Sequence, residues 1–330
     1  MDSLTQAVLG ASVAGVCAPA GHRRRALLVG AALGTLPDLD VMIDYGDPVS
    51  NFTYHRGFSH SLFVLAPFAI LLWLALRRWW APVREVPLRW FGAVFLALIT
   101  HPLLDAHTVY GTQLWWPMTV PPTMWSTLFI IDPLYTLPLL VGVGAAAAWP
   151  KHPRGTTVLR TGILLSTLYI GWSWTAKMTV EDKARDALTD LGLADRPMFS
   201  VPTPFNTVLW RVVALTDEGS VEGFDSLLLD EGTMNFRRFD SDTGSLAAAS
   251  DIRAVARLRW FTRDFLRATM DEDGRLALAD LRMGQEPDYV FAHIVAEIGN
   301  PHWKPIPPEE IPFDASQRAL GDTWRRILAP

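Results

Sequence analysis

Three pairs of side chains in the first third of the sequence have the types and spacing of metal ligands. The first pair is Asp38 and Asp40, which follow Pro37 and flank a single leucine. Two carboxylates two residues apart in extended chain point to the same side. Without a cation between them they would repel each other, and one would stay protonated. A divalent metal ion removes that conflict.

The other two pairs add imidazole groups. His55 and His60 lie five residues apart around Gly57, which is typical of a tight loop that leads into a helix. His101 and Asp105 are four residues apart and would share one face of a helix. Zinc binds imidazole and carboxylate ligands together. The three pairs predict a divalent metal site, with zinc favoured and manganese or iron also compatible with such ligands.

Apolar helices have to position these pairs, because the first half of the chain is apolar with few charges. Residues 1–176 hold 11 of the 29 Lys and Arg residues and 8 of the 34 Asp and Glu residues. Six apolar stretches follow one another, at residues 4–20, 26–39, 61–76, 90–104, 130–149 and 158–176. The last two have the length of a membrane span, whereas the first four are shorter and rich in Gly and Ala. We expect a mainly α polytopic membrane domain of about six helices over residues 1–176.

The basic residues predict which helix ends face the cytoplasm. They concentrate between the first and second, the third and fourth, and the fifth and sixth stretches, as in the three arginines at 23–25. Such loops stay on the cytoplasmic side of an inner membrane. With six crossings, the three ligand pairs then meet at the opposite, extracytoplasmic face. That face also receives Thr5, Gln6, Arg56, Asp132 and all of residues 177–330.

Each pattern alone has a simpler structural explanation. An Asp-x-Asp turn is more often a cap than a ligand pair, loop histidines can be surface residues, and a helical His–Asp pair can be only hydrogen-bonded. Asp132 before Pro133 is more typical of a helix N-cap than of a ligand. The topology rests on the basic loops only, yet it brings three pairs to one face. This coincidence favours a metal site.

The same segments resemble a known family. Residues 1–10 and the segments Pro37-Asp38-Leu39-Asp40, His55-Arg56-Gly57-Phe58-Ser59-His60-Ser61 and His101-Pro102-Leu103-Leu104-Asp105 look like those of the LexA-regulated, membrane-bound metal-dependent hydrolases (YdjM-like). The resemblance covers about the first half of the chain. Residues 111–114 and 202–207 look like a longer branch with an additional C-terminal domain.

The resemblance implies a hydrolase with a helical fold. The family is grouped distantly with the zinc-dependent phospholipase C and single-strand nuclease superfamily, whose zinc ions are bound by His and Asp. The ligand candidates that this implies here are Asp38, Asp40, His55, His60, His101 and Asp105.

A metal held by these groups would activate water for attack on a phosphorus or carbonyl centre. Asp40, if it is not a ligand, is our candidate general base. Arg56 is predicted to hold an anionic group of the substrate, most naturally a phosphate, by paired hydrogen bonds. Alternatively, Arg56 pairs with Asp44 or Asp47. A site at the depth of lipid headgroups predicts an amphiphilic substrate such as a phospholipid, with membrane lipids as partners.

A second class of function remains open, in which the protein is a non-catalytic membrane scaffold or regulator whose C-terminal domain binds a partner. A structural zinc site has four protein ligands, whereas a catalytic site keeps an open position. An ion transporter is less favoured, because transporter sites usually lie near the bilayer midplane. An intramembrane metalloprotease is disfavoured, because no His-Glu-x-x-His segment occurs.

Composition excludes further classes. The formal net charge is −5 and no basic stripe is interleaved with aromatic residues, so nucleic-acid binding is not expected. Cys17 is the lone cysteine, which excludes an intrachain disulfide and a cysteine-based zinc site.

Residues 177–330 predict a smaller, soluble α+β domain outside the membrane. A helix is expected at residues 251–270, and short strands are expected at residues 207–215, 220–229, 235–239, 275–282 and 289–298. His293 and His302 in this domain have no partners identifiable from the sequence. The oligomeric state and the partner of this domain are not predicted.

Overall fold

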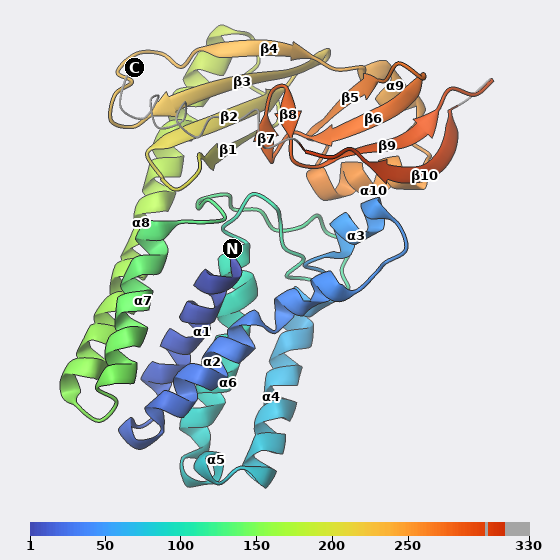
Figure 1. Cartoon of the computed structure of the whole chain (residues 1–330). Coiled ribbons are helices and arrows are strands. Elements are labelled where there is room, and N and C mark those ends of the chain that lie inside the picture. Colours follow the sequence, from blue (N-terminus) through green and yellow to red (C-terminus); the bar gives the residue numbers. More distant parts are fainter. Residues whose placement is uncertain (301–302, 314–330) are drawn as a thin grey trace. The chain divides into compact units, whose positions relative to one another are not determined.

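The computed structural model describes residues 1–300 and 303–313 (Figure 1). The chain forms two compact units. One consists of residues 1–42 and 56–174, and the other of residues 43–55 and the chain from Thr175 onward. We call them the helical unit and the sheet unit. His302 lies outside the described residues.

A helix occupies each of the six apolar stretches, as predicted. The main helices of the helical unit are α1 (Ser3–Cys17), α2 (Arg23–Thr35), α4 (Leu62–Trp79), α6 (Pro87–Asp105), α7 (Pro133–Ala148) and α8 (Pro153–Asp190), which continues into the sheet unit. Short elements connect them: η1 (Ala20–His22), η2 (Pro37–Met42), η3 (Phe58–His60) and α5 (Ala81–Glu85).

Two helices of the described chain are long and apolar enough to cross a membrane, namely α4 and α6. From stretch length alone, spans were expected instead at the last two stretches, residues 130–149 and 158–176. That choice was wrong by this criterion, because α7 begins at the N-cap Asp132 and spans only 16 residues. α8 is long, but it does not meet the criterion, and α1 and α7 are shorter apolar helices. Six full crossings therefore remain a prediction.

Helices α1 and α2 cross with their backbones in contact at three glycines. A Cβ atom at Gly34 would lie 2.5 Å from the backbone oxygen of Gln6, and one at Gly30 would collide with the backbone of Gly10. Helices approach this closely only where small residues meet. The third partner is α6, which packs against both helices and against α4. Its Trp90 and Leu98 are fully buried.

The sheet unit contains two antiparallel four-stranded sheets and a two-stranded hairpin. The first sheet has the order β1 (Met198–Pro202), β2 (Leu209–Leu215), β3 (Gly219–Ser226), β4 (Phe236–Asp240). The second has the order β10 (Lys304–Glu310), β9 (Ala292–Glu297), β6 (Arg275–Asp280), β5 (Leu266–Met270), and β7 (Gly284–Gln285) pairs with β8 (Asp288–Tyr289). The helices are α3 (Pro48–Tyr54), α9 (Thr243–Ala248), α10 (Arg253–Thr262) and the end of α8.

The C-terminal part of α8 covers one face of the first sheet. Ala176, Val180 and Ala184 recur at four-residue spacing and pack against Trp210 and Val212 of β2. Small residues on the helix allow the large indole of Trp210 to be fully buried. Apolar side chains at i, i+4 and i+8 form the buried face of an amphipathic helix.

One secondary-structure prediction in this unit was wrong. The helix expected over residues 251–270 ends at Thr262, because Arg263 and Asp264 both have positive φ angles, 57° and 64°. Leu266–Met270 is the strand β5, paired with β6. Of the apolar residues that gave this segment its helical period, only Leu266 lies in the strand.

We predict that Gly30→Ala destabilises the helical unit by about 1–3 kcal/mol, since overpacking forces the two backbones apart. The matched control is Gly144→Ala, where a Cβ would have nothing within 4 Å. It should be neutral or slightly stabilising, because Ala favours helix over Gly. Thermal unfolding in detergent compares the two. Equal effects would show that the glycine crossing is not tightly packed.

We also predict that the sheet unit loses stability in mild acid because of His293. This residue is 2% exposed, and burial lowers its pKa from 6.5 to about 4, with Asp280 and Asp47 opposing the shift. The unfolded chain then binds the proton more readily than the folded chain. Stability should fall by about 1.4 kcal/mol per pH unit from pH 6.5 towards 4. Hydrogen exchange of the β9 amides measures the stability of the sheet unit at each pH. The variant His293→Leu should show a weaker dependence of stability on pH. An unchanged pH dependence in this variant would exclude His293 as the cause.

Candidate metal centre

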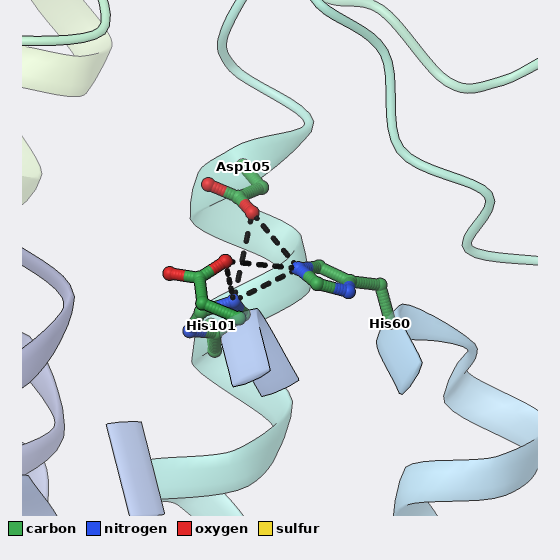
Figure 2. A group of neighbouring side chains, drawn as sticks. His60, His101 and Asp105 are labelled. Carbon is green, nitrogen blue, oxygen red and sulfur yellow. Dashed lines mark hydrogen bonds and ion pairs between the residues drawn. The ribbon is translucent and has the colours of Figure 1, made fainter. Parts of the chain in front are cut away.

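Four predicted ligands come together in the helical unit. Asp38 from η2, His60 from η3, and His101 and Asp105 from α6 each offer one ligand atom, and these atoms all lie within 4.8 Å of one another. Figure 2 shows His60 pointing at the face of α6 that carries His101 and Asp105. The side chains of His60, His101 and Asp105 are fully buried, and that of Asp38 is 19% exposed.

The spacing of the four ligand atoms fits one metal ion. The two Nε2 atoms are 3.0 Å apart, and Asp38 Oδ1 is 3.4 Å from each of them. Asp105 Oδ2 is 3.2 Å from His60 Nε2 and 3.5 Å from His101 Nε2. Zinc–ligand bonds of about 2.0–2.2 Å in a tetrahedron separate the ligands by about 3.3–3.6 Å. The carboxylate–imidazole distances lie close to this spacing, and the donor set suits a single zinc ion.

Hydrogen bonds to α1 and α2 orient the two ligands on α6. His101 Nδ1 lies 2.5 Å from the backbone oxygen of Gly34, so this nitrogen carries the proton and Nε2 keeps its lone pair. Gln6 Nε2 donates to Asp105 Oδ1 at 2.9 Å and to the backbone oxygen of His101 at 3.2 Å. The Met1 amino group also contacts Asp105 Oδ1. These contacts leave Asp105 Oδ2 turned towards the histidines.

Asp40 lies behind His60 and is absent from the four-ligand group. Its Oδ2 accepts from the Arg56 backbone N–H at 2.9 Å and from Ser59 Oγ at 2.5 Å. The same oxygen is 3.6 Å from His60 Nδ1, whereas the ligand atom of His60 is Nε2. We had expected both carboxylates of the turn on one side, as in extended chain. The segment is a 3₁₀ helix, in which residues two apart point away from each other.

His60 and Asp38, the two ligands outside the candidate spans, each stabilise the charged form of the other. Burial alone would lower the pKa of His60, but hydrogen bonds to Asp105 and Asp38 raise it above its ordinary value. Burial alone would raise the pKa of Asp38, but hydrogen bonds to His101 and His60 lower it below its ordinary value. Positive charge is therefore favoured at the point where the ligand atoms meet.

Arg56 pairs with a ligand and not with the acidic loop. Its Nε is 3.2 Å from Asp105 Oδ2, and its Nη1 donates to Thr108 Oγ1 at 3.0 Å. The guanidinium carbon lies 5.0 Å from the ring centroid of Tyr110, and the residue is 4% exposed.

The alternative pairing of Arg56 with the loop carboxylates is not seen. Asp44 accepts from the backbone of Gly46 and from Asn51 Nδ2. Asp47 accepts from the backbone and hydroxyl of Ser50 and caps α3.

The remaining predicted residues lie outside the four-ligand group. His55 is the C-cap residue of α3 and belongs to the sheet unit. Asp132 is an N-cap, as its ordinary interpretation predicted, and accepts from the backbone N–H groups of Leu134 and Tyr135.

Sequence reasoning missed several groups that support the ligands. The carbonyl of Gly34 has no sequence signature, because any residue carries one. Ser59 and Thr108 carry no sequence signal for their contacts with Asp40, His60 and Arg56. The topology predicted Gln6 at the same membrane face as the ligands, but gave it no role. Its side-chain amide reaches α6 only because the glycines let α1 and α2 approach closely.

Comparison with known proteins agrees with a membrane location. Residues 1–180 match the family model described as YdjM inner membrane protein. The chain is also similar to the inner membrane protein YbcI of Escherichia coli (strain K12), with 34% identity over 93 residues, which is 28% of this chain and 52% of that protein. The chain thus spans about half the length of this curated relative. No solved structure matches.

We predict that purified protein contains near-stoichiometric metal and that His60→Ala and His101→Ala lose it, because each removes a buried ligand. His55→Ala and His107→Ala serve as controls and should retain the metal, because neither side chain belongs to the four-ligand group; His107 Nδ1 instead lies 2.7 Å from Thr127 Oγ1. Elemental mass spectrometry on folded protein measures the content. Loss of the metal in His55→Ala would mean that the four residues are not the complete ligand set.

Proposed function

The chain belongs to the YdjM inner membrane protein family, and from its buried Asp/His group we propose that it is a metal-dependent hydrolase of the inner membrane. The bond we favour for cleavage is a phosphoester in an amphiphilic, lipid-like substrate. We further propose that the site and the sheet unit lie on the extracytoplasmic face, as the basic loops predict.

The observation that carries this proposal is the convergence of two imidazole Nε2 atoms and two carboxylates on one point. His101 Nδ1 is held by Gly34, and His60 Nδ1 lies 2.9 Å from Ser59 Oγ. Ligating histidines are commonly oriented through their second nitrogen in this way. Zinc suits this donor set best, and manganese or iron would also be accepted.

A divalent metal bound there would supply a Lewis acid and a water that ionises near neutral pH. Among the chain's own groups, Asp38 is the ligand at the accessible edge, so we assign substrate approach to its side. We assign Asp40 to the orientation of His60, since its Oδ2 is already bonded to Arg56 and Ser59. General-base action by Asp40 remains the alternative role.

Arg56 is assigned to charge balance at Asp105. Its guanidinium lies against the buried carboxylate, with Nε 3.2 Å from Asp105 Oδ2. Its predicted contact with an anionic substrate group stays a proposal. Arg56→Lys keeps the charge but loses the planar fork, so a selective rise in KM for anionic substrates would support that contact.

A lipid-like substrate is supported by apolar side chains next to two ligands. Leu39, which follows Asp38, is 54% exposed, and Phe58 in the turn that carries His60 is 41% exposed. Val41 and Met42 at the end of η2 are also exposed, at 72% and 80%. An amphiphile would place its polar group at the metal and its apolar chain against this surface.

A non-catalytic scaffold is the second candidate function. Four protein ligands are the usual number in a closed structural zinc site. In that case the ion would tie η2 and η3 to α6. The two functions differ in what removal of the metal changes.

We predict that the metal-loaded protein hydrolyses phosphoesters, with a preference for lipid-like substrates over soluble ones. Chelation should abolish turnover, and added zinc or manganese should restore it. Asp38→Asn should lose nearly all turnover, because a neutral amide is a poor ligand in place of a carboxylate. The rate is measured as inorganic phosphate released from phosphomonoesters, and as alcohol or phosphomonoester released from phosphodiesters and phospholipids.

The scaffold hypothesis predicts different turnover and melting-temperature results for the same purified protein. Metal-loaded, folded protein would turn over none of these substrates, and chelation would lower its melting temperature. That result would overturn the hydrolase proposal.

A further inference from the structure

The chain leaves the helical unit between two residues of the metal centre. Residues 43–55 belong to the sheet unit, while Asp40 and Arg56 on either side belong to the helical unit. The base of this excursion is closed by the hydrogen bond from the Arg56 N–H to Asp40 Oδ2. Ser59 binds the same oxygen and reaches His60 Nδ1. The closing bond is thus part of the network that orients a ligand.

Aromatic packing holds the far end of the excursion within the sheet unit. The ring of Phe52 in α3 is 4.9 Å from Phe261 of α10 and 4.4 Å from Phe291, measured between centroids. Its centroid is 5.6 Å from that of His293 on β9. Phe52 is 6% exposed. α3 is therefore anchored by residues more than 200 positions later in the sequence.

Arg257 of α10 fastens the end of α3 that leads to Arg56. Its Nε donates to Thr53 Oγ1 at 2.9 Å and its Nη2 to the Thr53 backbone oxygen at 3.1 Å. The guanidinium lies between the rings of Tyr54 and Trp260, at 4.1 and 4.3 Å from their centroids. Such a fork and stack define the position of the bound group more closely than a lysine would.

Only two residues separate Thr53 from Arg56. A displacement of Thr53 therefore also displaces the backbone of Arg56, because three residues span at most about 10 Å. Arg56 has a φ angle of 58°, a left-handed conformation that a non-glycine residue keeps only where its surroundings enforce it. In this conformation its backbone N–H donates to Asp40 while its guanidinium pairs with Asp105.

We propose that Arg257 of the sheet unit is a positioning residue for the metal centre, acting through Thr53 on Arg56 and hence on His60 and Asp105. The sheet unit thereby controls how well the helical unit binds its metal. This inference rests on the metal centre of the proposed function, but not on the reaction it catalyses.

The test is zinc affinity of the full-length protein, measured by competition with a chelator of known affinity. Arg257→Ala should weaken zinc binding by about tenfold, the lower range for loss of groups that orient ligands. Arg257→Lys, which keeps the charge without the fork, should show a smaller weakening. The matched control is Arg259→Ala two positions away, whose side chain is 38% exposed and pairs with Asp264. It should leave the affinity unchanged.

An insertion separates positioning from simple stabilisation of the sheet unit. Two glycines between His55 and Arg56 should weaken zinc binding, and Arg257→Ala should then have no further effect. The same insertion after Gly46, an exposed position on the long side of the excursion, should leave the affinity unchanged. If Arg257 acted only on stability, the two effects would add.

The outcomes are distinguishable from failure of the metal centre itself. Wild-type protein that binds no zinc would remove the metal centre. Wild-type protein that binds zinc, with folded Arg257→Ala or Arg257→Lys protein binding it equally well, would overturn the positioning role. So would additive effects of Arg257→Ala and the His55–Arg56 insertion. Hydrogen exchange of the sheet unit confirms that each variant is folded.

Discussion

Asp105 is a carboxylate with no exposed side-chain surface at the end of an apolar helix, and such a charge must be compensated by its neighbours. Arg56, His60 and His101 face one of its oxygens, while Gln6 and the Met1 amino group face the other. The partners come from four different parts of the helical unit. The requirement to neutralise this group thus dictates how α1, η3 and α6 meet. A bound cation would satisfy the same requirement and would release Arg56 from part of it.

The glycine crossing of α1 and α2 makes that compensation geometrically possible. With backbones in contact at Gly10, Gly30 and Gly34, the Gln6 amide and the Gly34 carbonyl both reach α6. Gly34 therefore has two functions, since its missing side chain admits α1 and its oxygen orients His101. Larger residues at these positions would separate the helices and leave buried polar groups without partners. In this unit the same glycines determine both how the helices pack and how the ligands are oriented.

The sequence was sufficient for the apolar helices, because they depend on local spacing. His101 and Asp105 follow from the helical period alone. The sequence could not tell which of Asp38 and Asp40 faces the histidine Nε2 atoms, since this depends on whether their segment is extended or a 3₁₀ helix. His55 and His60 appeared equivalent because a five-residue spacing does not reveal that His55 belongs to the sheet unit and His60 to the helical unit. The membership of residues 43–55 in the sheet unit was not predictable, as its evidence is contacts with Phe261 and Arg257 far along the chain.

The pairing of Thr53 with Arg257 also has a consequence for biosynthesis. The two residues are 204 positions apart, so α3 emerges from the ribosome long before α10 exists. At about 5–20 residues per second, that delay is on the order of 10–40 s. During this interval the two candidate spans α4 and α6 are completed, while Phe52 still lacks its aromatic partners Phe261 and Phe291. The earliest-made connector of the metal centre is thus among the last parts of the protein to reach its final structure, and this period is when the chain would be most open to proteases and chaperones.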